Sequence, residues 1–224
     1  MGAVVHWFEN LADSFANAIY VTLIQEDQYK QLLRGLGKSL ELTAIAAVIG
    51  VILGLLLAIA KLQDVDNLTG NPVVIWIRKM VAGFANGYIS VIRGTPAVVQ
   101  LMVIYFILYL RVLNKLPLFS GVSDVVIASI AFGINSSAYV AEIIRGGIMS
   151  VDNGQFEAGR SLGFNYVQTM LYIVIPQVFK SVLPALLNEF IALLKETSVA
   201  GYVGIMDLTK AGDLIRGRTF SAFM

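Results

Sequence analysis

The sequence has no cysteine, a single histidine and few charged residues. The lack of cysteine excludes disulfides, thiolate metal sites and cysteine nucleophiles. The one histidine, His6, cannot build a histidine-rich metal site alone, and we interpret it as a residue at a membrane interface. Charged residues form 14% of the 224 residues, whereas a soluble domain usually carries about 25%. With a net charge of +1, the chain gives no sign of a nucleic-acid partner, and we expect neither a metal site nor a catalytic site.

Hydrophobic residues, in contrast, are abundant. They make up 57% of the chain, and the mean hydropathy is +0.76. A bilayer core about 30 Å thick is crossed by about 20 helical residues. Four segments are long and apolar enough to span it, namely Leu40 to Ala60, Val73 to Leu110, Val122 to Ile144 and Met170 to Leu194. The sequence therefore predicts an all-α, polytopic membrane helical bundle with four visible spans.

Two of these spans contain proline. Pro96 lacks a backbone donor and disfavours helix at Thr95, so the second span should be one long or broken helix. The part after the break, Ala97 to Leu110, is too short to cross a bilayer alone. Backbone groups freed at the break must face protein or water rather than lipid. Pro176 and Pro184 are expected to interrupt the fourth span.

The regions outside the spans also show helical patterns. Residues 3–24 carry apolar side chains at helical spacing, which predicts an amphipathic helix in the membrane interface. We treat residues 1–30 as this helix and its link, and residues 31–224 as the membrane domain. A short amphipathic helix is expected near Ile205 to Ile215. The N-terminus lacks a basic region followed by an apolar run, so no cleaved signal peptide is expected.

A polar segment at about 150–166 separates the third and fourth spans. Asp152, with Gln155 three residues later, resembles a helix start, and Gly163 resembles a helix stop. Glu157 and Arg160 lie one turn apart and could pair with each other or with a partner. The segment also offers aromatic or aliphatic side chains at Phe156, Leu162 and Phe164, and small residues at Ala158, Gly159 and Gly163. These residue types suit close contact with another protein surface.

Charged and polar residues within the spans are candidates for a substrate path, because charges at bilayer depth are retained where they face protein or water. The candidates are Arg93, Gln100, Asn135, Ser136, Tyr139, Glu142, Asn188, Glu189, Lys195, Glu196, Thr197 and Ser198. A zwitterionic amino acid needs donors for its carboxylate, such as Arg93 or Lys195, and acceptors for its ammonium, such as Glu142 or Glu189. Alternatively, these groups pair with one another and hold the helices together. Asn135, Tyr139 and Glu142 share one helical face.

The order Glu157-Ala158-Gly159, then Gly163, then Ile173-Val174-Ile175-Pro176 resembles the coupling motif of the membrane subunits of ATP-binding-cassette (ABC) importers. Three other stretches, 92–101, 139–148 and 194–198, look like signatures of polar amino-acid importer permeases of the type I fold. The resemblance runs from about residue 35 to 220. It implies a coupling helix at about 152–164, with Phe156, Glu157, Ala158, Gly159, Arg160, Gly163 and Phe164 contacting an ATPase.

The same resemblance implies the function and the partners. The chain would be a permease rather than an enzyme, translocating a polar amino acid across the bacterial cytoplasmic membrane as a multi-pass protein. Two partner ATPase subunits would bind and hydrolyse ATP with Mg²⁺, and this chain would bind no cofactor. A second permease copy or a paralogue, and an extracellular or periplasmic substrate-binding protein, would complete the importer. The N-terminus is placed outside by the resemblance alone, because the basic residues are evenly divided between the two sides.

Family members end with a further membrane helix, which this sequence does not include, so we expect a fifth span to be missing. Two alternative functions remain open at this point. An ion-coupled secondary amino-acid transporter would use Glu142 and Glu189 as proton carriers. A membrane scaffold would bind partners through residues 150–166 without moving a solute.

Overall fold

The computed structural model describes residues 6, 13–17, 19–24, 27–62, 71–117, 119 and 121–220. The described part is helical and contains no strand, which confirms the expected all-α class. The interfacial helix expected over residues 3–24 lies largely outside the described residues. Within its range, residues 13–17 are helical and Tyr20–Ile24 form a π-helix.

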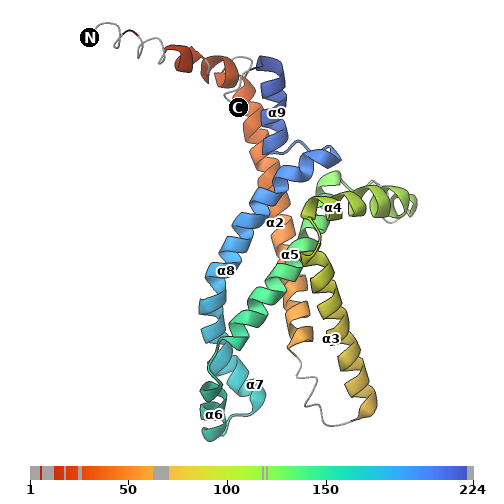
Figure 1. Cartoon of the computed structure of the whole chain (residues 1–224), viewed down its shortest axis with the longest axis vertical. Coiled ribbons are helices and arrows are strands. Elements are labelled where there is room, and N and C mark those ends of the chain that lie inside the picture. Colours follow the sequence, from red (N-terminus) through yellow and green to blue (C-terminus); the bar gives the residue numbers. More distant parts are fainter. Residues whose placement is uncertain are drawn as a thin grey trace. The chain divides into compact units, whose positions relative to one another are not determined.

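The helices follow one another along the whole described chain (Figure 1). In order they are α2 (Gln28–Lys61), α3 (Pro72–Arg93), α4 (Ala97–Met102), the π-helix η3 (Val103–Tyr109), the 3-10 helix η4 (Leu113–Lys115), α5 (Asp124–Met149), α6 (Asn153–Ser161), α7 (Tyr166–Thr169), the π-helix η5 (Met170–Val174), α8 (Ile175–Glu196), the 3-10 helix η6 (Thr197–Val203) and α9 (Leu208–Thr219). The chain divides into two compact units, one of residues 1–42 with 197–224 and one of residues 43–196.

Four helical segments of the described chain are long and apolar enough to cross a membrane. They are Gln28–Lys61, Ala97–Lys115, Asp124–Met149 and Tyr166–Val203. The second expected span, which the sequence predicted to be either one long helix or a broken helix, is broken. The part after the break is longer than expected. Helix continues beyond Leu110 to Lys115 and reaches 19 residues, enough for a crossing. The preceding helix, α3, carries Arg78 and Lys79.

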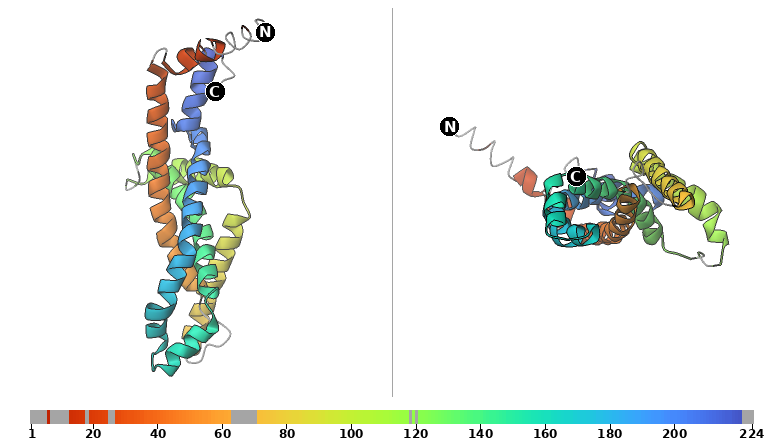
Figure 2. Two further views of the ribbon diagram at one scale, coloured as in Figure 1. Left: turned by 90° about the vertical axis from the view of Figure 1, so that its left-hand side faces the viewer. Right: turned by 90° about the horizontal axis from the view of Figure 1, so that it is seen from below.

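The unit of residues 43–196 is centred on α5. This helix packs most extensively against α8 and also against α3 and α4, and α5 and α8 cross in Figures 1 and 2. Glycines let α2 approach α5 closely. A Cβ placed on Gly50 would lie 3.0 Å from Ser136 Oγ, and one on Gly54 would lie 2.6 Å from Val140 Cγ1. The close contact therefore uses small residues spaced four apart, as in other membrane helix pairs.

Prolines affect the fourth membrane segment less than expected. Pro184 lies inside α8 and does not end it, and Pro176 is the second residue of α8. A π-helix, Met170–Val174, directly precedes α8. Proline is tolerated in the first turn of a helix, where its missing N–H would have no partner. Of the two expected interruptions, the one near Pro176 is a change of helix type just before it. The one expected at Pro184 does not occur, because α8 is continuous there.

The other unit, residues 1–42 with 197–224, contains the first part of α2 together with η6 and α9. Asp207 caps α9 by accepting a hydrogen bond from the Lys210 N–H at 3.0 Å. Gly35 of α2 allows the turn before α9 to approach, because a Cβ there would lie 2.7 Å from the Asp207 carbonyl oxygen. The Leu208 N–H donates to Ser39 Oγ at 3.2 Å. The short helix expected near Ile205 to Ile215 is present as α9, shifted towards the C-terminus.

Candidate functional site

The polar segment between α5 and α8 forms a separate short helix, α6, which begins at a defined cap. The Asp152 side chain accepts from the Gly154 N–H at 2.6 Å, so one of the unpaired donors of the first turn is satisfied. The helix is polar and its axis departs from that of α5 (Figure 1). The start signal read from Asp152 is therefore present in the structure.

The end of α6 is equally well defined. Gly163 has a φ of +80°, a backbone conformation that glycine adopts without steric cost. Its N–H donates to the Arg160 carbonyl at 2.9 Å, and the Phe164 N–H donates to the Gly159 carbonyl at 3.0 Å. This pair of hydrogen bonds is a Schellman motif. The chain then enters α7 through a capping box made by Asn165 and Gln168.

One side of α6 packs on its own chain. Gly159 is buried, and a Cβ there would lie 2.6 Å from Thr169 Oγ1. The close approach that this glycine permits is thus made by α7. Phe156 stacks on Tyr166 with ring centroids 6.2 Å apart, and it also packs against the core cluster around Val174. These contacts fix the orientation of α6 on the segment that leads into α8.

The other side of α6 is open. Glu157, Ala158, Arg160 and Gly163 are all exposed, and Leu162 is 72% exposed. Within the described residues neither Glu157 nor Arg160 takes part in an ion pair. Their charges are therefore available to another surface.

Phe164 differs from the exposed coupling candidates. It is half-buried and lies 6.2 Å from Tyr172, measured between ring centroids. Of the seven expected coupling residues, Glu157, Ala158, Arg160 and Gly163 thus face outward, whereas Phe156, Gly159 and Phe164 pack at least partly on their own chain.

The substrate-path candidates do not converge on one point; the structure places several of them in pairs between helices. The first pair is Gln100 and Asn135, both buried, with Asn135 Nδ2 donating to Gln100 Oε1 at 3.1 Å. Gln100 Nε2 in turn lies 2.7 Å from the Ile92 carbonyl oxygen and 3.1 Å from the Thr95 carbonyl oxygen. The Ile92 and Thr95 carbonyls at the break before Pro96 are thus satisfied by protein.

The second pair is Arg93 and Tyr139. The Arg93 guanidinium lies over the Tyr139 ring, 5.3 Å from its centroid, at a distance where a cation and an aromatic face attract. Arg93 itself is exposed. Sequence reasoning missed the neighbouring Tyr88, whose hydroxyl donates to the Ile134 carbonyl at 2.8 Å and lies 2.8 Å from Ser137 Oγ.

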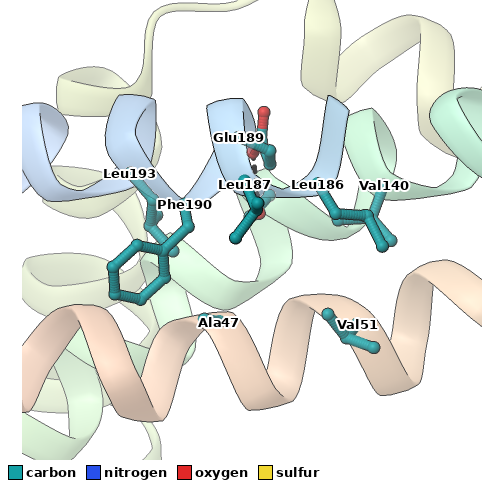
Figure 3. Close-up of a pocket in the computed structure, with 9 residues that line it drawn as sticks. Ala47, Val51, Val140, Leu186, Leu187, Glu189, Phe190 and Leu193 are labelled. Carbon is teal, nitrogen blue, oxygen red and sulfur yellow. Dashed lines mark hydrogen bonds between the residues drawn. The ribbon is translucent and has the colours of Figure 1, made fainter. Parts of the chain in front are cut away.

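The third pair, Ser136 and Glu189, joins α5 to α8. Ser136 Oγ donates to Glu189 Oε1 at 2.8 Å. Both residues line a cavity of about 180 Å³ between α2, α5 and α8. The rest of its lining is apolar, and Figure 3 shows Phe190 and Leu187 pointing from α8 towards α2. Among the described residues that line this cavity, Glu189 alone is charged.

The remaining candidate on α5, Glu142, is held by cations on both sides. Its Oε1 accepts from Lys61 Nζ at the end of α2, and its Oε2 accepts from Arg145 Nε at 3.0 Å and Nη2 at 2.9 Å. Sequence reasoning missed both partners. Arg145 could have been found from its i+3 spacing on the same helix, but nothing in the sequence relates Lys61 to Glu142.

The last candidates lie where α8 passes into η6. In α8, Asn188 and Lys195 are exposed and Glu196 is half-buried. In η6, Thr197 is buried and Ser198 is exposed. In the described part of the chain, no group of three or more histidine or acidic side chains could hold a metal ion.

The fold and the site together define a class of protein: a helical protein with four segments able to cross a membrane and a short polar helix, α6, between two of them. The family model for the binding-protein-dependent transport system inner membrane component matches residues 50–224. The arginine transport system permease protein ArtQ of Bacillus subtilis is 39% identical over 181 residues, covering 80% of this chain and 73% of the relative. The L-cystine transport system permease protein TcyB of the same organism is 32% identical over 212 residues, covering 94% and 82%.

A solved structure points the same way. The crystal structure of an amino acid ABC transporter with histidines superposes with a TM-score of 0.72 at 40% identity, covering 90% of this chain and 85% of that chain. The chain belongs to the binding-protein-dependent transport system inner membrane component family. It is the membrane-spanning permease subunit of an amino-acid ABC importer and not an enzyme, since separate ATPase subunits hydrolyse ATP in this family. This confirms the expected family and function, and the secondary transporter is not favoured.

Proposed function

We propose that this permease carries a polar amino acid across the bacterial cytoplasmic membrane. Two ATPase subunits, which bind ATP and Mg²⁺, dock on α6 and on the α6 of a second permease, either another copy of this chain or a paralogue. A substrate-binding protein outside the membrane delivers the amino acid. The ArtQ and TcyB relatives are named for arginine and L-cystine, which supports an amino acid with a polar side chain.

The observation that carries this proposal is the two-sided character of α6. Its inner side is fixed to the segment leading into α8 through Gly159 and Phe156. Its outer side exposes Glu157, Arg160 and Leu162. A helix held rigidly on one side and open on the other can pass a displacement from a docked subunit to α8. For this to drive transport, each nucleotide state of the ATPase must favour one permease conformation over the other.

The substrate path is proposed to include the polar groups that remain accessible near the α5 and α8 helices. The Glu189 carboxylate faces the cavity between α2, α5 and α8 and could accept hydrogen bonds from a substrate ammonium. Arg93 is exposed beyond its contact with Tyr139 and could donate to a carboxylate. Gln100 and Asn135 are proposed to shape the path, because their polar atoms are engaged with each other and with the helix break.

A charge reversal at the exposed face of α6 tests the docking proposal. The variant Arg160→Glu should insert normally, because the Arg160 side chain is exposed and forms no ion pair within the described residues. We expect it to lose ATP-dependent amino-acid uptake in proteoliposomes and to retain less ATPase during purification of the importer. Uptake is measured with a panel of amino acids, with the cognate ATPase and binding protein supplied.

The matched control is Lys115→Glu, which makes the same change of charge at an exposed position in η4. This control should leave both uptake and ATPase retention near the wild-type level. Wild-type uptake and retention in the Arg160→Glu variant would contradict docking at α6.

A further inference from the structure

Glu142 stands at the centre of an ion-pair cluster that joins two helices of the unit of residues 43–196. Its two carboxylate oxygens have separate partners, since Oε1 accepts from Lys61 and Oε2 accepts from the forked guanidinium of Arg145. The three side chains are 22%, 18% and 29% exposed for Lys61, Glu142 and Arg145. Groups this far from bulk water interact more strongly than surface pairs.

The ion-pair cluster lies at the end of α2 and close to the end of α5. Lys61 is the last residue of α2. Glu142 lies seven residues before Met149, where α5 ends and the chain turns into α6 at Asp152. The cluster therefore ties the end of α2 to the part of α5 that leads directly to the docking helix.

Packing beside the cluster brings the same helices close together. Ala58, Ala138 and Ala141 are fully buried in one core cluster, and a Cβ on Gly54 would lie 2.6 Å from Val140 Cγ1. Small residues allow the two backbones to approach closely. The Lys61–Glu142 ion pair adds a directional link between α2 and α5 at the end of this contact, and Arg145 holds the Glu142 carboxylate from the same helix.

We infer that Lys61, Glu142 and Arg145 form an ionic clamp of positioning residues, which passes a displacement of α6 through α5 to α2. The inference rests on the proposed docking at α6. In the clamp Glu142 does not contact the substrate, because both of its oxygens are already engaged by cations of the same chain. Weakening the clamp leaves substrate binding intact and lets the ATPase turn over without moving α2.

The test uses the complete importer in proteoliposomes and counts ATP molecules hydrolysed per amino acid taken up. We expect Lys61→Met and Glu142→Gln each to raise this ratio by at least about twofold, the lower range for substitutions that change coupling between sites. The substrate concentration for half-maximal uptake should stay at the wild-type value in both. The double variant should be no worse than the more affected single variant, because both remove the same interaction.

The matched control is the double variant Lys38→Met and Glu41→Gln, which removes an exposed ion pair of 2.7 Å at i,i+3 spacing elsewhere on α2. Its ratio should equal the wild-type ratio. Any of three results would overturn the clamp. The first is an unchanged ratio in Lys61→Met, and the second is a double variant in which the two single effects multiply. The third is a changed substrate concentration for half-maximal uptake in Glu142→Gln but not in Lys61→Met. Absence of ATP-dependent uptake by the wild-type importer would instead count against the proposed function.

Two further variants keep the clamp testable if the neutral substitutions prevent insertion. Lys61→Arg preserves the charge and should keep the wild-type ratio, whereas Glu142→Asp shortens the acceptor and should raise the ratio; equal ratios in the two would overturn the inference. The chain has no cysteine, so Lys61→Cys with Glu142→Cys can be joined specifically by a short thiol cross-linker. Cross-linking should bring the ratio back towards the wild-type value, and a ratio that it leaves unchanged would contradict the clamp.

Discussion

The side-chain amide of Gln100 lies 2.7 Å from the backbone carbonyl oxygen of Ile92, across the break between α3 and α4. Eight residues separate the two along the chain. The carbonyl belongs to the last turn of α3, where its backbone donors are the N–H groups of Gly94 and of Thr95, the latter at 3.5 Å. Gln100 supplies a further, closer donor, and Asn135 of α5 holds Gln100 in place by donating from Nδ2 to Gln100 Oε1 at 3.1 Å. The break is therefore fixed in one geometry by side chains from two neighbouring helices.

Replacing Gln100 by leucine should destabilise the permease. The substitution Gln100→Leu leaves the buried Asn135 amide without its acceptor and removes the closest donor to the Ile92 carbonyl. An unsatisfied buried group costs about 1–3 kcal/mol. We expect the free energy of unfolding to fall by at least that amount. It can be measured by titration with a denaturing detergent in mixed micelles.

The control for this prediction is Gln177→Leu. Gln177 Nε2 also donates to a backbone carbonyl, that of Ile173, at 2.9 Å, but Gln177 is exposed. Its loss should change the free energy of unfolding by less than about 0.5 kcal/mol. Equal effects of the two substitutions would show that burial of the Gln100 network is not what stabilises the break.

This break also shows how far the sequence alone could go. Pro96 predicted where the helix fails and required that the freed backbone groups face protein or water. It could not identify Gln100 as the partner, because the contact depends on how the chain turns between α3 and α4. Nor could it predict that helix continues beyond Leu110 to Lys115, since the short 3-10 helix η4 that ends this segment has no signal of its own in the sequence.

The same contrast holds for α6 and for the charged residues. The caps of α6 at Asp152 and Gly163 are local in sequence, and both were predicted. The close packing of Gly159 is made against Thr169 of the next helix. The ion pair between Glu142 and Lys61 joins residues that are 81 positions apart in the sequence. Local hydrogen bonding leaves a pattern in the sequence, whereas contacts between helices depend on packing that one sequence does not display.

The contact between α5 and α8 predicts opposite effects at two adjacent glycines. A Cβ on Gly147 would lie 2.1 Å from Val182 Cγ2, whereas nothing lies within 4 Å of one on Gly146. Gly147→Ala should therefore lower the free energy of unfolding by about 1–3 kcal/mol through overpacking. Gly146→Ala should leave it unchanged or raise it by up to about 1 kcal/mol, because alanine favours helix.

The same unfolding titration compares the two glycine variants, and Val182→Ala provides a second check. Combined with Gly147→Ala, it removes the clashing methyl group and should restore part of the lost stability. A neutral Gly147→Ala variant would show that α5 and α8 lie farther apart than the structure places them.

Asp207 predicts a pH dependence for the segment of α9. Its carboxyl is fully buried, and this burial raises its pKa above the ordinary value of 3.8, against the lowering effect of hydrogen bonds from backbone groups such as the Lys210 N–H. Because the folded state binds the proton more tightly than the unfolded state, the contribution of Asp207 to stability is complete below the unfolded pKa. It is lost as the pH rises through the raised pKa.

Hydrogen exchange of the α9 amides can follow this loss of stability. Protection, corrected for the intrinsic pH dependence of exchange, should fall as the pH rises from below the ordinary pKa of 3.8 through the raised pKa of Asp207. The variant Asp207→Asn keeps a capping oxygen but has no charge to bury, so its protection should not vary over this range. A fall of equal size in the Asn variant would assign the effect to another group.

The contact of Gly159 with Thr169 makes the orientation of α6 testable by a compensating pair. A Cβ on Gly159 would lie 2.6 Å from Thr169 Oγ1 and 2.7 Å from its Cγ2, so Gly159→Ala should displace α6 from α7 and weaken coupling to the ATPase. Overpacking costs about 1–3 kcal/mol, which corresponds to a loss of about fivefold or more in ATP-dependent uptake if it falls on the docking-competent orientation. Thr169→Ala removes the two closest atoms, and alone it gives up a hydrogen bond of 3.1 Å to the Asn165 carbonyl and the packing of one buried methyl group. The double variant should therefore transport better than Gly159→Ala, whereas a double variant as impaired as Gly159→Ala would show that position 159 is sensed by a partner and not by Thr169.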